Sequence, residues 1–179
     1  MNKYIKTTLK IINTLIVTLT VIIVLIVLGT KLLGIQMFTV LSGSMEPEYP
    51  TGSLIFVKPA AASELEEGDV ITYMLSETTI STHRIIEVEN DEDGTLSFRT
   101  KGDANEIADA KPVLEENVIG TPVFVIPKLG VVMSNIQNPP GKYAALAIGL
   151  SLILFVFVTD SFTKDKKKKD EPESDKKSL

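Results

Sequence analysis

The sequence VLSGSMEP, residues 40–47, is the segment to which the other candidate features of the chain relate. An apolar run, residues 35–41, leads into a Ser-Gly-Ser corner, and two prolines follow it closely. Proline fixes φ and lacks an amide donor, so a regular helix is excluded and Ser44 should lie at a strand end or in a tight turn. A hydroxyl at such a place can be a nucleophile if a base reaches it. The alternative is that Ser42 and Ser44 are turn residues that hydrogen-bond to their own backbone.

Two uncharged apolar runs, residues 11–28 and 143–158, indicate a membrane protein. A helix needs about 20 residues to cross the hydrocarbon, with a lower limit near 17. The first run has 18 residues, whereas the second has 16 and is expected to depend on Lys142 and Asp160 at the interfaces or on a locally thinner bilayer. We expect the first run to be an uncleaved anchor, because it is longer than the apolar core of a signal peptide and no clear small-x-small site follows it.

Lysines flank the two runs on the sides that face the chain ends. They are Lys3, Lys6 and Lys10 before the first run, and Lys164, Lys166, Lys167, Lys168 and Lys169 after the second. The positive-inside rule therefore predicts two cytoplasmic termini in a cell membrane and an extracytoplasmic segment between the runs, residues 34–142. That segment has 17 acidic and 7 basic residues, which argues against nucleic acid as a partner. The chain contains no cysteine, so disulfide bonds and thiol catalysis are excluded.

Short apolar runs separated by turn residues predict that the segment between the membrane helices is a small all-β domain, a barrel or a sandwich. The expected strands are residues 35–41, 53–57, 70–75, 79–88, 95–100 and 118–126, with a hairpin between the fourth and the fifth around an acidic turn at 90–94. We expect a short helix or loop at 60–67, a polar loop at 101–111, and either a last strand or a piece lying on the membrane at 127–133. The predicted division of the chain is a cytoplasmic N-terminus (1–10), a transmembrane helix with a short linker (11–33), the β-rich domain (34–142), a second transmembrane helix (143–159) and a disordered lysine-rich tail (160–179).

His83 is the only histidine of the chain, and it is the expected general base for a serine. Strand alternation puts it on the same face as Ile85, so it can face a cleft rather than water. The predicted hairpin brings the end of the fifth strand near the start of the fourth, and Asp103 and Asp109 follow that end. Either carboxylate could contact and orient the imidazole. The alternatives are a structural histidine, an Asx-turn at Asp103 and a solvated loop charge at Asp109.

Three motifs in this order resemble the boxes of type I signal peptidases. They are V-L-S-G-S-M-E-P at 40–47, T-H-R-I at 82–85, and T-K-G-D-A-N at 100–105 followed by Asp109. The resemblance is to the endoplasmic-reticulum type, found in eukaryotes, archaea and some Gram-positive bacteria; the bacterial housekeeping type has a lysine where this chain has His83. It extends over nearly the whole chain, including the N-terminal anchor. One departure is the Ala-Asn pair after Asp103, where many relatives have Asn-Asn.

The resemblance implies a membrane-bound serine endopeptidase that removes signal peptides from exported preproteins. It assigns Ser44 as nucleophile, His83 as general base, Asp109 as the orienting carboxylate and Asp103 as a second required aspartate. Ser42 and the backbone N–H of Ser44 resemble the oxyanion donors. The implied partners are signal peptides, the lipid bilayer and, as a possibility, translocation machinery or processing subunits; no cofactor or metal is expected.

Two other readings of the sequence lead to different functions. A catalytically inactive relative could act as a subunit of a processing complex, and the loss of Ser44 or His83 would distinguish it; both residues are present. A structural membrane-anchored β-domain at the cell surface would explain the apolar runs and the acidity, but not the ordered motifs.

Overall fold

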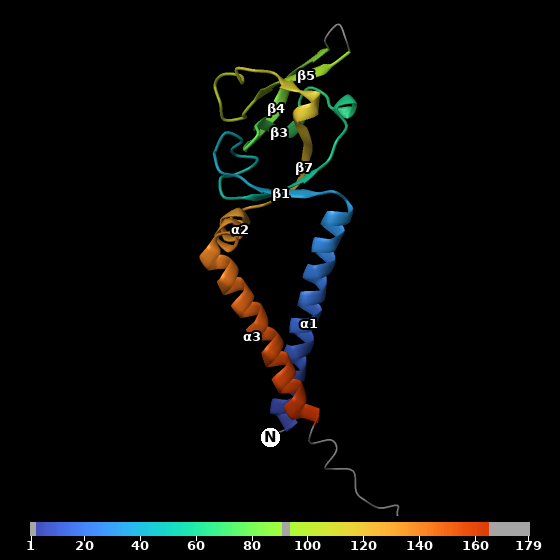
Figure 1. The fold of residues 1–179 in the computed structure, drawn as a ribbon, viewed down its shortest axis with the longest axis vertical. Helices are drawn as coiled ribbons and strands as arrows, with labels where there is room; N and C mark the ends of the chain where they lie inside the picture. The colour runs from blue at the N-terminus through green and yellow to red at the C-terminus, as the bar shows by residue number, and fades with distance from the viewer. Residues whose placement is uncertain (1–2, 91–93, 165–179) are drawn as a thin grey trace, which may run out of the picture. The chain divides into compact units, whose positions relative to one another are not determined.

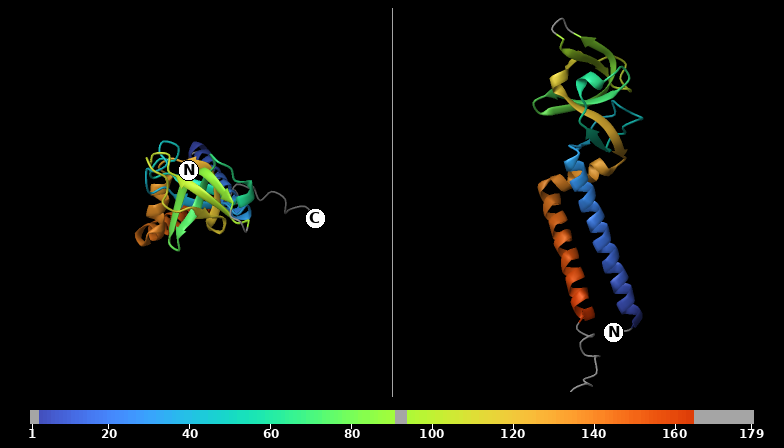
Figure 2. Two further views of the ribbon diagram at one scale, coloured as in Figure 1. Left: turned by 90° about the horizontal axis from the view of Figure 1, so that it is seen from above. Right: turned by 90° about the vertical axis from the view of Figure 1, so that its right-hand side faces the viewer.

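The computed structural model of the chain describes residues 3–90 and 94–164, drawn in Figure 1 and from two further sides in Figure 2. The chain divides into two compact units. One is the segment Leu28–Asn138, and the other joins the residues up to Val27 with those from Pro139 onward. The middle of the predicted acidic turn, residues 91–93, and most of the predicted lysine-rich tail, residues 165–179, lie outside the described residues.

Two long apolar helices begin and end the described chain: α1 (Lys3–Leu32) and α3 (Pro139–Lys164). Their membrane-compatible parts are Tyr4–Leu32 and Pro139–Ser161, with mean hydropathies of 3.0 and 2.1, and neither is buried inside the protein. At 1.5 Å per residue, the 23 residues of the second extend about 35 Å, more than the roughly 30 Å of a hydrocarbon core. The helix thus extends beyond the 16-residue apolar run at both ends. Within this helical unit, Nδ2 of Asn13 donates a hydrogen bond to Oγ1 of Thr159 at 2.7 Å.

The unit Leu28–Asn138 is built on an antiparallel sheet. Its strands are β1 (Gln36–Thr39), β2 (Leu54–Lys58), β3 (Val70–Ser76), β4 (Thr79–Asn90), β5 (Leu96–Lys101), β6 (Val113–Leu114) and β7 (Val118–Ile126). Over the described residues these seven strands have the order β1-β2-β7-β3-β4-β5-β6. All six predicted strands are present within a few residues of their expected bounds, and the predicted hairpin is the pair β4–β5.

The prediction of an all-β domain is correct only in part. Residues 129–137, within and just beyond a segment predicted as a strand or a membrane-lying piece, form the helix α2 (Leu129–Gln137). The glycine at position 130 allows this helix to start against the chain before β2, since a Cβ there would lie 2.3 Å from the carbonyl oxygen of Ser53. Two short 3-10 helices, η1 (Ala62–Glu64) and η2 (Glu115–Asn117), complete the unit, and η1 agrees with the expected short helix or loop at 60–67.

Strand β7 connects the two halves of the sheet because it pairs with β2 over its C-terminal part and with β3 over its N-terminal part. Both pairings contain a register shift, one of them beside Pro122 and the other beside Gly120. A Cβ at Gly120 would lie 2.0 Å from the carbonyl oxygen of Lys58, so only glycine fits where β7 passes the end of β2. The change of partner along β7 brings β3 and β4, which hold the histidine, close to β1 and β2, which lead into the serine turn.

The core consists of two apolar clusters. One packs between β3, β4 and β5 around Ile71, Tyr73, Ile85 and Phe98, and the other packs around Met45, Tyr49, Ile55, Val57 and Val70. The opposite face of β1, β2 and β7 has an apolar cross-strand row, Met37, Phe56 and Phe124. The Met37 and Phe124 side chains of this row are 42% and 61% exposed. Helix α2 packs on β1 and β2, and the row remains partly exposed beside it.

Candidate active site

Ser44 lies in a turn that is held in place by buried residues after it. Met45 and Tyr49 are 2% and 8% exposed and belong to the second core cluster. The amide of Glu46 donates to the carbonyl oxygen of Gly43 at 3.0 Å, and Oγ1 of Thr51 donates to Oε1 of Glu46 at 3.1 Å. These contacts hold the hydroxyl of Ser44 on a turn at the end of β1, as the sequence predicts.

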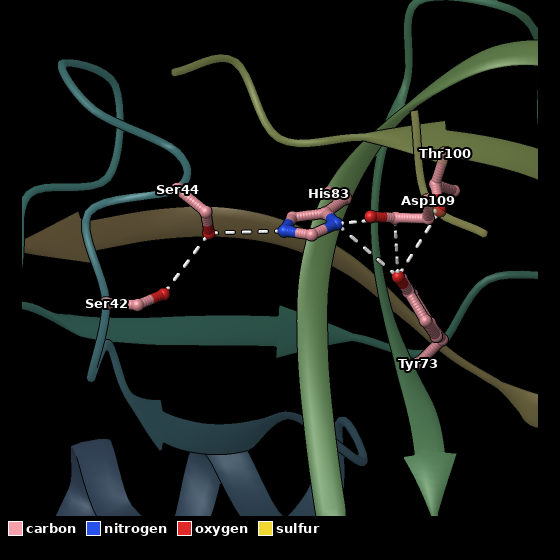
Figure 3. A network of polar contacts seen from close by, with 6 residues as sticks. All are labelled: Ser42, Ser44, Tyr73, His83, Thr100 and Asp109. Atoms are coloured by element: carbon pink, nitrogen blue, oxygen red, sulfur yellow. Dashed lines mark hydrogen bonds and ion pairs between the residues drawn. The ribbon is translucent and has the colours of Figure 1, made fainter. Parts of the chain in front are cut away.

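His83 lies on β4 opposite Ile71 of β3 and is 9% exposed. It shares a face with Ile85, which is 1% exposed, so the predicted strand alternation is confirmed. Its Nε2 is 3.1 Å from Oγ of Ser44, as Figure 3 shows. One edge of the imidazole therefore meets the serine, while the other points toward the core.

Asp109 is the aspartate that contacts the histidine. Its Oδ2 lies 2.6 Å from Nδ1 of His83. The loop after β5 turns back so that the amide of Asp109 donates to the carbonyl oxygen of Thr100 at 2.8 Å. Oδ2 also accepts hydrogen bonds from Oγ1 of Thr100 at 2.6 Å and from the hydroxyl of Tyr73 at 3.0 Å (Figure 3). Burial alone would raise the pKa of this carboxyl, but the hydrogen bonds from Thr100, His83 and Tyr73 outweigh it and hold the pKa below its ordinary value.

Asp103 contacts an arginine instead of the histidine. Nε of Arg84 donates to Oδ1 of Asp103 at 2.9 Å and Nη2 donates to Oδ2 at 2.7 Å, a bidentate pair. The same guanidinium donates to Oε2 of Glu48 at 2.5 Å and to the carbonyl oxygen of Gly68 at 2.8 Å. The hydrogen bonds from Arg84 hold the pKa of the Asp103 carboxyl below its ordinary value, against the opposing effect of burial. Arg84 thus ties the serine turn, through Glu48, to the loop that contains both aspartates.

A second contact joins this loop to the serine turn through the backbone. The amide of Ala104 donates to the carbonyl oxygen of Ser44 at 2.9 Å. A Cβ at Gly102 would lie 2.6 Å from that same oxygen, so the approach requires glycine. The nucleophile candidate and the aspartate loop are therefore positioned by the same interactions.

Ser42 lies on the other side of the serine from the histidine. Its Oγ is 3.2 Å from Oγ of Ser44 (Figure 3). A hydroxyl at that position, together with the backbone N–H of Ser44, can donate to a negative oxygen that forms next to the serine.

A groove of about 300 Å³ opens beside Ser44. Leu41 and Ile80, on its two sides, are 83% and 45% exposed. The residues that line it come from β1 and the turn after it (Phe38, Thr39, Val40, Leu41, Ser42, Ser44, Met45, Tyr49), from β2 (Ile55), and from the start of β4 and the turn before it (Thr78, Ile80, Ser81, Thr82). The groove leads along the edges of β1 and β4 to the hydroxyl of Ser44, and its wall is more apolar than polar.

Four residues of this site were not predicted from the sequence: Glu48, Tyr73, Arg84 and Thr100. Each is an ordinary residue of a strand or a turn. Tyr73, Arg84 and Thr100 contact an aspartate, whereas Glu48 contacts Arg84. Arg84 was part of the T-H-R-I motif. Because arginine forms bidentate pairs with carboxylates, its presence there could have predicted a contact with the acidic loop.

Over residues 3–90 and 94–164, no cluster of three histidine, aspartate or glutamate side chains is arranged to hold a metal ion.

A serine hydroxyl, an imidazole and a half-buried carboxylate in this order and at these distances define a serine hydrolase site. A family model described as signal peptidase, peptidase S26, matches residues 12–94. Signal peptidase I W of Bacillus subtilis (strain 168) is 44% identical over 117 residues, which are 61% of this chain and 61% of that protein. The signal peptidase complex catalytic subunit SEC11C of Homo sapiens is 32% identical over 118 residues, 61% of this chain and 62% of that protein.

The chain is thus similar to signal peptidases of the peptidase S26 family over residues 12–94, and to these two relatives over about 117 residues. Its matches span about three fifths of the length of these relatives. Two helices of the described chain, α1 and α3, are long and apolar enough to cross a membrane.

Proposed function

We propose that this chain is a membrane-bound serine endopeptidase that removes N-terminal signal peptides from exported preproteins. The observation that supports it most directly is the contact series from Ser44 through His83 to Asp109, with donor–acceptor distances of 3.1 and 2.6 Å, next to an apolar groove. The names of two relatives, signal peptidase I W and the signal peptidase complex catalytic subunit SEC11C, also support this reaction.

In the proposed mechanism Oγ of Ser44 attacks the scissile carbonyl carbon, and its proton passes to Nε2 of His83. The carbonyl oxygen becomes an oxyanion, which accepts hydrogen bonds from the Ser44 amide and the Ser42 hydroxyl. The imidazolium then gives the proton to the leaving amine as the peptide bond breaks, leaving an acyl ester on Ser44. Water attacks the ester with His83 again as base, and the signal peptide leaves with a free carboxylate. Asp109 stays ionised and stabilises the imidazolium throughout.

The substrate is proposed to bind as an extended strand in the groove. Among the described residues, β1 pairs only with β2, and the stretch from Thr79 to Thr82 of β4 pairs only with β3. Both strands border the groove and both have a free edge there, so backbone hydrogen bonds can hold an extended peptide without reading its sequence. The modest volume of the groove favours small side chains next to the scissile bond.

The proposed topology has two transmembrane helices, a small β-rich peptidase domain outside the cytoplasm and both termini inside it. The lysines at the two ends support this orientation through the positive-inside rule. A signal peptide that is itself in the bilayer then meets the enzyme on one surface, which raises its effective concentration. Translocation machinery or processing subunits are possible further partners.

The direct test uses membranes that contain the full chain and a labelled preprotein. We expect cleavage at a single site by the wild type and none by Ser44→Ala. Ser151→Ala, which removes a hydroxyl of α3 that donates to the carbonyl oxygen of Ile148, is a matched control and should cleave normally. Unchanged cleavage by Ser44→Ala would refute the proposal.

A further inference from the structure

The two side chains behind Asp109 form a buried hydroxyl pair. Tyr73 of β3 is 2% exposed, and Thr100 of β5 is fully buried. Their oxygens are 3.3 Å apart, and both reach the same carboxylate oxygen, Oδ2, which also faces His83. Figure 3 shows the side chains of His83, Tyr73 and Thr100 grouped around Asp109. Neither hydroxyl lines the substrate groove.

The hydroxyl protons have one favourable acceptor. Thr100 is 2.6 Å from Oδ2 and Tyr73 is 3.0 Å from it, whereas Tyr73 is 3.5 Å from Nδ1 of His83. Because the charged Oδ2 of Asp109 is the nearer acceptor, both hydroxyls donate their hydrogen bonds to it. Burial is the main cause that raises the pKa of Tyr73, so the phenol keeps its proton and remains a donor.

The arrangement then determines the state of the imidazole. Nδ1 of His83 faces the ionised Asp109 carboxylate at 2.6 Å and the Tyr73 hydroxyl at 3.5 Å. That hydroxyl already donates its hydrogen bond to Asp109. An unprotonated Nδ1 would place its lone pair against that carboxylate, so Nδ1 must have the proton. Nε2 is then the unprotonated nitrogen, and it faces the Ser44 hydroxyl at 3.1 Å.

We propose that Tyr73 and Thr100 are positioning residues, which together hold the Asp109 carboxylate so that the imidazole keeps its proton on Nδ1. The inference rests on the proposed function of His83 as general base. Asp109 itself lies on a loop, outside the strands and helices. The two hydroxyls, which come from the interior of the sheet, supply the rigidity that the loop lacks.

The test compares Tyr73→Phe, Thr100→Val and the double variant, all of which remove hydroxyls and keep side-chain shape. We expect kcat to fall about tenfold in each single variant, since one charge-assisted hydrogen bond is lost, while KM stays unchanged. In the double variant kcat should fall by more than the product of the two single losses. The reason is that in each single variant the remaining donor still holds the carboxylate in its orientation. Thr100→Ser retains the donor and should cleave almost as the wild type does. Ser97→Ala, which removes a buried hydroxyl of the same strand β5 that contacts Glu89, is the matched control.

A second readout does not depend on cleavage. Because the chain has one histidine, labelling histidine with an NMR-active nitrogen isotope gives signals from a single imidazole. We expect the neutral ring to be protonated at Nδ1 in the wild type and increasingly at Nε2 in the double variant. Unchanged kcat and an Nδ1 proton in the double variant would overturn the proposal, as would equal losses in Thr100→Ser and Thr100→Val. If the wild type cleaves no preprotein, the proposed function fails, and the tautomer comparison still decides the positioning role.

Discussion

Replacing Asp109 by asparagine should give a milder defect here than it does in serine proteases of the trypsin type. There the change costs about 10⁴-fold in kcat, because the amide selects the wrong imidazole tautomer. In this chain Thr100, Tyr73 and His83 all donate to one oxygen, Oδ2. The amide of Asp109→Asn can put its carbonyl oxygen at that position and keep all three bonds, whereas the opposite rotamer would lose them. We therefore expect the Nδ1-protonated tautomer to persist.

What the variant loses is the negative charge. A carboxylate and an imidazolium about 4 Å apart between charge centres attract each other by about 4 kcal/mol at an effective dielectric constant near 20. That value suits this pair, whose side chains are 11% and 22% exposed. At 1.36 kcal/mol per factor of ten, the expected loss in kcat is about 10³-fold.

Single-turnover cleavage of a preprotein by the purified full chain measures this loss. Asp109→Ala removes both the charge and the acceptor, and it should be at least tenfold slower than Asp109→Asn. Adding Tyr73→Phe and Thr100→Val to Asp109→Asn frees the amide to rotate and should lower the rate to that of Asp109→Ala. The reasoning is wrong if Asp109→Asn and Asp109→Ala are equally slow while both variants keep the thermal stability of the wild type.

Five further predictions concern the site and the topology. Ser44→Ala and His83→Ala should each abolish cleavage, and the double variant should be no worse, because the residues act as a unit; additive losses in residual rate would contradict this. His83→Lys should be inactive over the whole pH range, since Asp109 would keep a lysine charged, and substantial cleavage would refute the orienting role. Arg84→Lys should lower the melting temperature by about 4–8 °C, because an ammonium cannot keep the bidentate pair with Asp103 together with the other two bonds. The pKa of Asp103 is lowered in the folded state, so as pH falls the unfolded chain protonates this carboxyl before the folded chain does. The stability that the Arg84–Asp103 pair contributes is therefore complete above about pH 4 and is lost at lower pH. Thermal melts in acid should show a smaller loss of stability for Asp103→Asn than for the wild type. Protease added outside spheroplasts should digest the segment 34–142 and spare both termini, whereas an accessible lysine-rich tail would exclude the two-helix topology.

The strands were predictable because their residues alternate or cluster in ways that glycine and proline interrupt. The helix α2 was not, because its apolar residues VVM fit a strand equally well over so short a segment. What decides for the helix is the close approach of Gly130 to Ser53, a contact between residues 77 positions apart that no local pattern contains. Strand β6 has two residues and gives too short a signal to detect.

The residues of the candidate site could be found in the sequence because their types are rare or unusually placed. A lone histidine on a strand and a serine after a Ser-Gly corner stand out. Which aspartate meets the histidine could not be read, since it depends on how the loop after β5 folds back to Thr100. The contact of Arg84 with Asp103 likewise needs the loop and β4 side by side, and only the folded chain brings them together.

The apolar row Met37, Phe56 and Phe124 has a consequence for work with the isolated domain. A fragment cut before β1 and after α2 would lose both hydrophobic helices and still present this row to water, next to the unpaired edge of β1. Exposed aromatic side chains beside an open strand edge favour intermolecular association. We therefore expect such a fragment to aggregate without detergent, and charged replacements at Met37 and Phe124, which point away from the core cluster, to be the substitutions that make it a soluble monomer.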